Sequence, residues 1–258
     1  MYKYYANNCY NLDALRNQYL WFSKRKFLND PYDLNVDILN RFTNLKSKLQ
    51  KRGDIESYSN IVEQFGICCF TTDYLNKHMW ALYANSYKGW CLEFKDDIVE
   101  PGCGVPPKFV PVQYQEQWPD LNNFDTEIRT SVDSNGNTVT TPIRGLLFGG
   151  ERDLENLFYY LLSAKEKAIW EQEKEYRLFL GNIYHKMYSI DTDAPGYKVK
   201  WKDGALKRII MGHNIEPYFK ESLMQIAQER AIPLLETQPV LTDETYKLDI
   251  HHVGVHNH

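Results

Sequence analysis

The pattern of apolar and polar residues changes period between residues 154 and 180. Over residues 154–169, apolar side chains recur at the spacing of one helix face. From Lys174 onward, polar and apolar residues alternate, which places Glu175 and Arg177 on one face of a predicted strand. A carboxylate at the start of a buried strand costs free energy unless it is hydrogen-bonded, paired or used. Glu175 is therefore the first candidate for a functional residue.

The same pattern predicts short strands and helices along the rest of the chain. Strands are predicted at residues 2–5, 19–23, 66–70, 90–94, 109–114 and 209–212, and a last one begins at Leu234. Helices are predicted at residues 11–16 with Asn11 as N-cap, after caps at Thr72 or Asp73, and at residues 217–231. The arrangement of these elements carries the prediction of fold class.

Three segments do not fit this series of core elements. Residues 37–64 are polar and rich in lysine, which predicts an excursion of two helices. Residues 101–107 are rich in proline and glycine and are predicted to be loop. The run Ser134-Asn135-Gly136-Asn137 between Val/Thr-rich arms predicts a hairpin insertion at residues 128–143.

The mixture of elements predicts the fold class. Short strands and helices follow one another at irregular intervals without an internal repeat, which favours an α+β fold over a doubly wound parallel sheet. The chain contains neither a glycine fingerprint for dinucleotides nor a P-loop. No linker clearly separates two domains, so residues 1–258 are expected to form a single domain.

Composition narrows the class of protein. The hydrophobic content of 43% and charged content of 25% are typical of soluble globular proteins. The formal net charge of −4 argues against a protein that coats nucleic acid, although a local basic patch such as the Lys-rich residues 41–52 could guide a polyanion. Five cysteines without a Cys-x-x-Cys spacing, and the lack of a signal region or apolar span, predict a reduced, cytoplasmic protein with no membrane contact.

Aromatic and histidine residues have both structural and functional interpretations. Trp80 and Tyr83 would stack on a ligand base, although their spacing of three also fits packing on one buried helix face, which we favour. Asn29, Asp30 and Asp33 would bind a ribose or build the turn around Pro31, and residues of these types favour the turn. The histidines of the tail, residues 251–258, include a helical metal spacing, but a glycine interrupts it and chain ends fray, so no metal site is expected.

Four segments together resemble the bacterial family known as domain of unknown function 2971. They are residues 20–23 leading into 27–33, residues 79–84 with 88–91, residues 170–177, and residues 209–212. The chain departs from this family at Leu82 and Tyr87, where its members usually carry histidines. Any role of those histidines therefore does not transfer to this chain.

The layout of that family resembles the ADP-ribosyltransferase fold, a small split β-sheet with flanking helices. This resemblance implies that Lys3 or Tyr5 occupies the basic position of the first strand and that Ser23 lies on the second. It also implies that Glu173-Lys174-Glu175 is the Glu-x-Glu pair at the start of the catalytic strand. The expected substrate is NAD.

The chemistry implied by the resemblance assigns a role to each acid. Breaking the nicotinamide–ribose bond develops a positive charge on the ribose, and a fixed carboxylate such as Glu175 would stabilise it. Glu173 would orient or deprotonate the acceptor. Arg177 would hold Glu175 ionised or bind the pyrophosphate, and the alternative is an ordinary ion pair on the strand surface.

Three classes of function follow from these observations. The first is an NAD-dependent ADP-ribosyltransferase that modifies a protein or nucleic acid, in a bacterial toxin or phage-defence context, with an antitoxin as an optional partner. The second is a hydrolase, either an NAD glycohydrolase or a nuclease that needs a divalent metal and a carboxylate cluster. The third is a non-catalytic binding module with an aromatic cleft. The first is expected to bind no metal.

Overall fold

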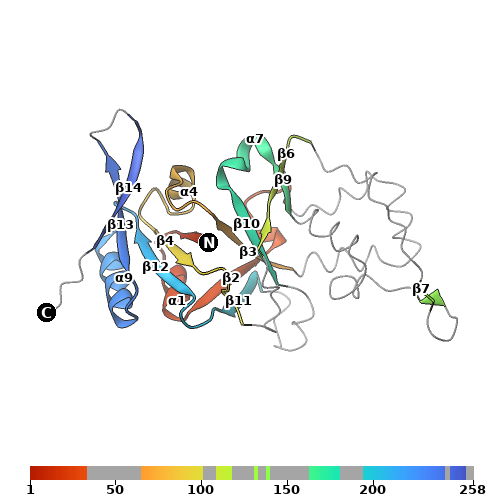
Figure 1. Cartoon of the computed structure of the whole chain (residues 1–258), viewed down its shortest axis with the longest axis horizontal. Helices are drawn as coiled ribbons and strands as arrows, with labels where there is room; N and C mark the ends of the chain where they lie inside the picture. The colour runs from red at the N-terminus through yellow and green to blue at the C-terminus, as the bar shows by residue number, and fades with distance from the viewer. Residues whose placement is uncertain are drawn as a thin grey trace.

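The computed structural model describes residues 1–33, 65–100, 109–117, 131–132, 138–139, 163–180, 194–241 and 245–253. These residues form a mixed α+β structure with a large, mostly antiparallel sheet and a few helices (Figure 1). The predicted α+β class is therefore confirmed. The predicted excursion at residues 37–64 and the loop at residues 101–107 lie outside the described residues.

Ten short strands form the main sheet. They are β1 (Tyr2–Tyr5), β2 (Tyr19–Lys24), β3 (Gly66–Thr71), β4 (Trp90–Phe94), β5 (Val110–Pro111), β10 (Glu175–Leu180), β11 (Gly196–Lys200), β12 (Leu206–Met211), β13 (Leu234–Val240) and β14 (Lys247–His252). Their order is β11-β2-β3-β1-β4-β12-β13-β14, with β10 beside β3 and β5 beside β10. Strands β12 and β13 are parallel, and the other described pairs of this sheet are antiparallel.

The main sheet forks at β3. One edge of β3 pairs with β10 along all six residues. The other edge pairs with β2 at its start, where Ser23 lies opposite Ile67, and with β1 at its end, where Tyr2 lies opposite Thr71. At the start of β3 the strands approach closely, because a Cβ atom on Gly66 would lie 2.8 Å from the Tyr197 ring. Strands β1 and β2 therefore diverge from a common neighbour that carries β10 on its far edge.

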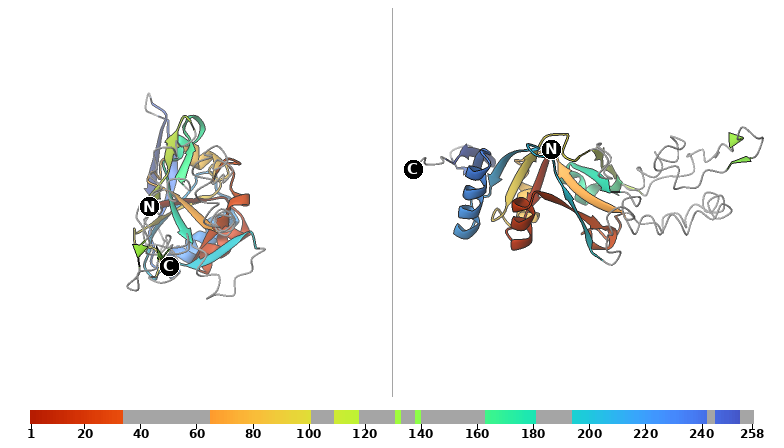
Figure 2. Two further views of the ribbon diagram at one scale, coloured as in Figure 1. Left: turned by 90° about the vertical axis from the view of Figure 1, so that its right-hand side faces the viewer. Right: turned by 90° about the horizontal axis from the view of Figure 1, so that it is seen from below.

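Helices cover both faces of this sheet. Helices α1 (Cys9–Arg16) and α9 (Pro217–Glu229) contribute Leu15 and Leu223 to the larger core cluster and lie on one side of the sheet (Figure 2). The short helix α4 (Lys77–Leu82) contributes Trp80 to a second cluster, where its ring meets the edge of Tyr4 at 5.1 Å. The second cluster lies on the α4 side, and this is the side on which the candidate site is found.

Most strand predictions are confirmed, but several boundaries were wrong. Helix α1 begins one turn earlier than predicted, because Asn8 and not Asn11 is its N-cap, and Asn8 Oδ1 accepts from the Asn11 N–H. Helix α4 is capped by Asn76, whose side chain accepts from two backbone N–H groups, rather than by Thr72 or Asp73. Strands β11 and β14 were not predicted, since their apolar runs are short and interrupted by charges.

Of the predictions for the segment before β10 and for the hairpin, the first was partly wrong and the second is confirmed. Residues 164–166, predicted as part of a long helix, instead form β9 (Ala164–Glu166), which pairs in parallel with β6 (Gln113–Gln115). Helix follows in α7 (Lys167–Trp170), and residues 154–162 of the predicted helix lie outside the described residues. The predicted hairpin is confirmed by the antiparallel pair β7 (Ser131–Val132) and β8 (Thr138–Val139). Among the described residues, no helix is long and apolar enough to cross a bilayer.

Candidate active site

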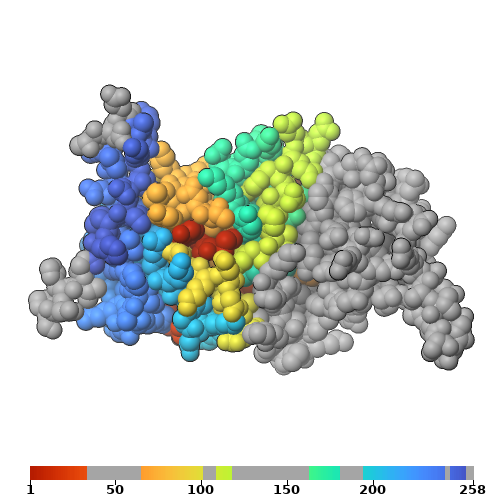
Figure 3. Space-filling view, in the orientation of Figure 1, coloured from red at the N-terminus to blue at the C-terminus, as the bar shows by residue number. Residues whose placement is uncertain are grey.

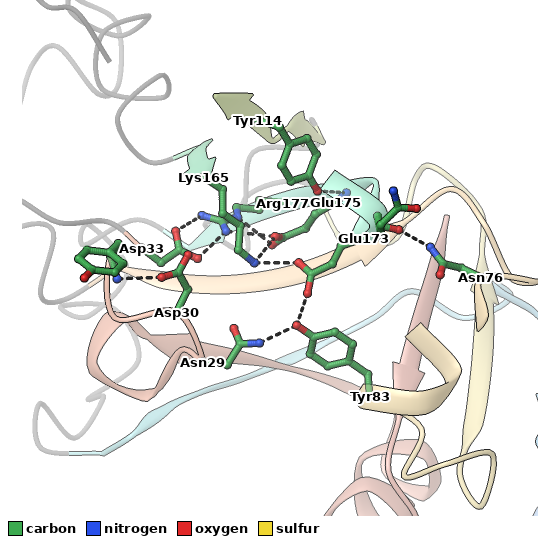
Figure 4. A network of polar contacts seen from close by, with 12 residues as sticks. Asn29, Asp30, Asp33, Asn76, Tyr83, Tyr114, Lys165, Glu173, Glu175 and Arg177 are labelled. Carbon is green, nitrogen blue, oxygen red and sulfur yellow. Dashed lines mark hydrogen bonds and ion pairs between the residues drawn. The ribbon is translucent and has the colours of Figure 1, made fainter. Parts of the chain in front are cut away.

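Five charged side chains form a buried ion cluster at the start of β10. They are Asp33, Lys165, Glu173, Glu175 and Arg177, and each residue is at most 7% exposed. They come from two parts of the chain that are distant in sequence, Asp33 after β2 and the stretch of residues 165–177, which meet beside α4 (Figure 4). Burial of charge is costly unless every charge is paired and hydrogen-bonded, so the contacts within this cluster decide what it can do.

Local backbone geometry places the two glutamates. After α7 the chain forms a 3₁₀ turn, η3 (Glu171–Glu173), and Lys174 then adopts a left-handed conformation with φ 48° and ψ 48° before β10 begins. Glu173 therefore lies on the turn that precedes β10, and only Glu175 of the Glu-x-Glu pair implied by the resemblance lies on the strand. The strand alternation from Glu175 onward is confirmed, with Glu175 and Arg177 on one face.

Arg177 is fully buried and its guanidinium contacts two carboxylates. Nη1 and Nη2 donate to the two oxygens of Asp33 at 2.7 and 2.6 Å, a bidentate pair. Nε donates to Glu175 Oε1 at 2.8 Å, and Nη2 also donates to Glu175 Oε2 at 3.1 Å. The interpretation of a surface ion pair is therefore wrong. Of the two predicted roles, the geometry supports holding Glu175 ionised rather than binding pyrophosphate.

Lys165 contacts both glutamates from β9. Its ammonium donates to Glu173 Oε2 at 2.8 Å and to Glu175 Oε2 at 3.3 Å. It also lies 4.2 Å from the centre of the Trp170 ring, a distance typical of a cation–π contact. In the parallel pair β6–β9, Lys165 lies opposite Tyr114, whose hydroxyl accepts from the Glu175 backbone N–H at 2.7 Å. The small β6–β9 sheet therefore holds both the side chain and the backbone at the start of β10.

Neutral donors reach the cluster from the α4 side. The Tyr83 hydroxyl donates to Glu173 Oε1, and Asn29 Nδ2 donates to the Tyr83 oxygen at 2.6 Å. The amide of Asn76, the N-cap of α4, donates to the Gln172 carbonyl and ties α4 to η3. In the space-filling view, red atoms of the N-terminal strand are visible in a hollow between the orange segment that contains α4 and the green segment that contains α7 and β10 (Figure 3). Asn29 is exposed, and Tyr83 and Asn76 are half-buried, so these neutral residues are less buried than the five charged residues of the ion cluster.

The ionisation of the cluster follows from its contacts. Burial raises the pKa of Glu175, but the charges of Arg177 and Lys165 outweigh burial and lower this pKa to about 2. Burial lowers the pKa of Lys165, and the charges of Glu175 and Glu173 reverse this and raise it. For Tyr83, burial and the charge of Glu173 both raise the pKa. Glu175 is thus a carboxylate and Lys165 an ammonium at neutral pH.

The predicted ligand residues are only partly brought together. Tyr2 lies opposite Thr71 and Thr71 lies opposite Glu175, so Tyr2 shares the face of Glu175 while Lys3 and Tyr5 point to the other face. Lys3 Nζ donates to the Cys69 carbonyl, and Tyr5 is buried in the larger core. Lys3 and Tyr5 therefore lie on the face of the sheet opposite to Glu175, and their predicted contact with NAD stays a prediction.

Ser23, Trp80 and Tyr83 differ in where they lie relative to the ion cluster. Ser23 lies opposite Ile67 and Ile67 lies opposite Phe179, which places Ser23 on the same face as Arg177. Trp80 is fully buried and stacks on Tyr87, so packing rather than stacking on a ligand is its use. Tyr83 alone of the aromatic pair contacts the cluster, through its hydroxyl group.

Four residues of this site were missed or misjudged from the sequence. Lys165 fell within the helix predicted over residues 154–169, and Tyr114 was considered only as part of a strand. Asn29 and Asp33 were assigned to a turn, and Asp30 does accept from the Tyr32 N–H as such a turn requires. The sequence signal that was available for Asp33 is its type alone, because its partner Arg177 lies 144 residues away.

Within the described parts of the chain, no group of three or more His, Cys, Asp or Glu side chains is arranged to hold a metal ion. In the ion cluster, each carboxylate accepts from a lysine or an arginine instead. Of the tail histidines, His251 and His252 lie on β14, where a helical spacing does not apply, and residues 254–258 lie outside the described residues.

Comparisons with protein-family models, with curated proteins and with solved structures found no match for this chain. The resemblances noted in the sequence therefore remain hypotheses, and the case for function rests on the geometry of the ion cluster.

Proposed function

We propose that this protein is an ADP-ribosyltransferase-like enzyme that cleaves the nicotinamide–ribose bond of NAD and transfers ADP-ribose to a macromolecule. The observation that carries this proposal is the carboxylate of Glu175, which begins β10 and is held ionised by Arg177 and Lys165. A carboxylate fixed in this way stabilises a cation that develops beside it, and preorganised charge is usually the largest catalytic contribution.

The position of the second acid supports the same chemistry. Glu173 lies beside Glu175, and both accept from the ammonium of Lys165. Glu173 would accept a hydrogen bond or a proton from the acceptor group once the ribosyl cation forms. The fork between β1 and β2 at β3 is compatible with the split sheet of the ADP-ribosyltransferase fold.

Access to the acids would come from the side of α4. Glu173 and Glu175 are 2% and 5% exposed, so a substrate must displace a neighbouring group. The neutral pair of Tyr83 and Asn29 is the less buried side of the network, and it can move without breaking an ion pair. NAD would enter there, with a ribose hydroxyl replacing the Tyr83 hydroxyl on Glu173.

The residues present fit part of the NAD molecule. Carboxylates suit the ribose hydroxyls, and Ser23 on the same face is available as a further polar contact. Arg177 is committed to Asp33 and Glu175, so the pyrophosphate would need a different cation. The acceptor, whether a protein or a nucleic acid, and an antitoxin partner stay open within this proposal.

The test is NAD turnover by the purified protein with cell lysate as the source of acceptor. We expect Glu175→Gln to lower nicotinamide release about 100- to 1000-fold, the size of effect seen when one preorganised contact to a developing charge is removed. Glu171→Gln is the matched control, because Glu171 lies on the same turn, η3, and is exposed. It should leave the rate unchanged.

NAD that carries an isotope label in its ADP-ribose part distinguishes the related activities. Label from the ADP-ribose part that stays on macromolecules supports transfer, whereas free ADP-ribose alone supports an NAD glycohydrolase that uses the same acids. No release of nicotinamide by the native protein, in the presence and absence of added divalent metal, would contradict the proposal.

A further inference from the structure

Lys165 is more deeply buried than the other lysines that form ion pairs with acids among the described residues. Its side chain is 3% exposed, whereas the side chains of Lys167, Lys174, Lys198, Lys202, Lys207 and Lys220 are 19–59% exposed. Its three nearest partners come from successive elements of the chain, namely Trp170 in α7, Glu173 in η3 and Glu175 in β10. The ammonium therefore lies between the two acids of the proposed mechanism.

We propose that Lys165 is a positioning residue that holds Glu173 and Glu175 together as a pair of carboxylates. This inference rests on the proposed function for its catalytic meaning, but the structural role of Lys165 can be tested without any activity. Lys165 would not contact NAD. It would act through the orientation and the charge of the two glutamates.

The physical argument starts from repulsion between like charges. Two carboxylates that share one buried site cannot both stay ionised without a cation between them, and one of them takes up a proton instead. Arg177 is bonded to Glu175 and to Asp33, while Lys165 is bonded to Glu173 and to Glu175. Removal of Lys165 would therefore leave Glu173 without its ion pair and leave Glu175 with Arg177.

The other groups around Lys165 do not substitute for its charge. The titratable groups that face the cluster are Asp30 and Asp33 from the turn after β2, Cys69 from β3, Tyr83 after α4, and Tyr114 from β6. Burial raises the pKa of Cys69, Tyr83 and Tyr114, so these three groups are neutral at neutral pH. Asp33 is paired with Arg177, and burial raises the pKa of Asp30, so neither acid supplies the positive charge that Lys165 brings.

Besides its charge, Lys165 fixes the orientation of the Glu173 carboxylate. Glu173 Oε2 accepts from Lys165 while Glu173 Oε1 accepts from Tyr83, so the two contacts set the plane of this carboxylate. The Trp170 ring covers the ammonium from a third side. A methionine at position 165 would keep much of the side-chain volume and its contact with Trp170, but would remove the charge and both hydrogen bonds.

The decisive experiment follows the side-chain carboxyl carbons by NMR as pH is lowered, in protein labelled with ¹³C at glutamate. The Glu175 signal is assigned by its loss in Glu175→Gln, and the Glu173 signal by its loss in Glu173→Gln. In Lys165→Met, we expect the titration midpoints to rise by about 1 pH unit or more, the usual effect of losing a counter-charge at contact distance. Lys165→Arg should restore most of the native midpoints. Unchanged midpoints in folded Lys165→Met would overturn the proposal.

A second measurement covers the case in which Lys165→Met does not fold. In the native protein, the ¹⁵Nζ signal of Lys165 should shift as each of the two glutamates takes up its proton, because its ammonium is bonded to both. An Nζ signal that does not respond to either titration would also overturn the proposal.

Activity gives a separate readout. If the native protein cleaves NAD, the acidic limb of its rate against pH should move upward in Lys165→Met and return in Lys165→Arg. A rate that falls equally at every pH would assign Lys165 a merely structural role. If the native protein cleaves no NAD, the proposed function fails, while the NMR titrations still decide whether Lys165 holds the acid pair.

Discussion

At the scale of single residues, substitutions in the buried ion pair of Arg177 with Asp33 should lower the stability of the protein strongly. Arg177 has no exposed surface, and Asp33 is 3% exposed. Removing Asp33 takes one of two carboxylate counter-charges and two hydrogen-bond acceptors from a guanidinium that water does not reach. We expect Asp33→Ala to lower the free energy of unfolding by about 3–5 kcal/mol, as measured by urea denaturation.

The control for this prediction is an exposed ion pair between an aspartate and another basic side chain. Asp97 pairs with Lys202, and the Asp97 side chain is 68% exposed. Because water replaces the lost partner there, Asp97→Ala should cost less than about 1 kcal/mol. Equal losses in the two variants would show that burial of the Asp33–Arg177 pair does not matter to stability.

The same residues show what a sequence can and cannot reveal about this site. Glu175 and Arg177 are two apart on a strand, so alternation alone predicted that they share a face, and they do. Asp33 and Lys165 could not be placed, since their contacts depend on tertiary pairing and not on spacing. Lys165 reaches the acids because β9 pairs with β6, an arrangement that no local pattern signals.

At the scale of elements, the junction between η3 and β10 sets the spacing of the two acids. Lys174 forms this junction in the left-handed region, with φ 48°, which costs a side chain about 1–2 kcal/mol and is especially unfavourable for β-branched residues. We expect Lys174→Val to lower the free energy of unfolding by about 1–2 kcal/mol and to reduce NAD turnover, because Glu173 would shift relative to Glu175. Denaturation and the turnover assay would measure the two effects.

The control separates backbone conformation from loss of charge. Lys174 also pairs with Asp73 at 3.0 Å, and Lys174→Asn removes this exposed pair just as valine does. Asparagine tolerates the left-handed conformation, so Lys174→Asn should keep nearly all of the stability and turnover. A similar loss in both variants would mean that the ion pair, not the backbone, maintains the junction.

Elements with a clear period were predicted well, and those that depend on partners were not. Strands β1 to β4 and β10 follow short apolar or alternating runs that suffice to identify them. Residues 164–166 lie within a stretch whose apolar residues recur at helical spacing, yet they form β9 because the β6 strand offers backbone partners. The helix cap at Asn76 was missed because Thr72 and Asp73 are equally good caps by type.

At the scale of the whole molecule, the ion cluster links protonation to global stability. It joins the turn after β2, the β6–β9 sheet, η3 and β10, so unfolding releases all of these charges into water. The pKa of Glu175 is lowered to about 2 from an ordinary value of 4.5. A lowered pKa means that the contribution to stability is complete above about pH 4.5 and is lost as the pH falls toward 2.

The difference in unfolding free energy between the native protein and Glu175→Gln should therefore depend on pH. Many carboxylates titrate between pH 6 and pH 3, but glutamine at position 175 does not, so the comparison isolates Glu175. We expect the difference in unfolding free energy between the native protein and Glu175→Gln to narrow by about 2 kcal/mol between pH 6 and pH 3. Denaturant unfolding at constant ionic strength measures it. A difference that stays constant would mean that Glu175 binds its proton equally well in the folded and unfolded chains, and the counter-charges of Arg177 and Lys165 would then not hold it ionised.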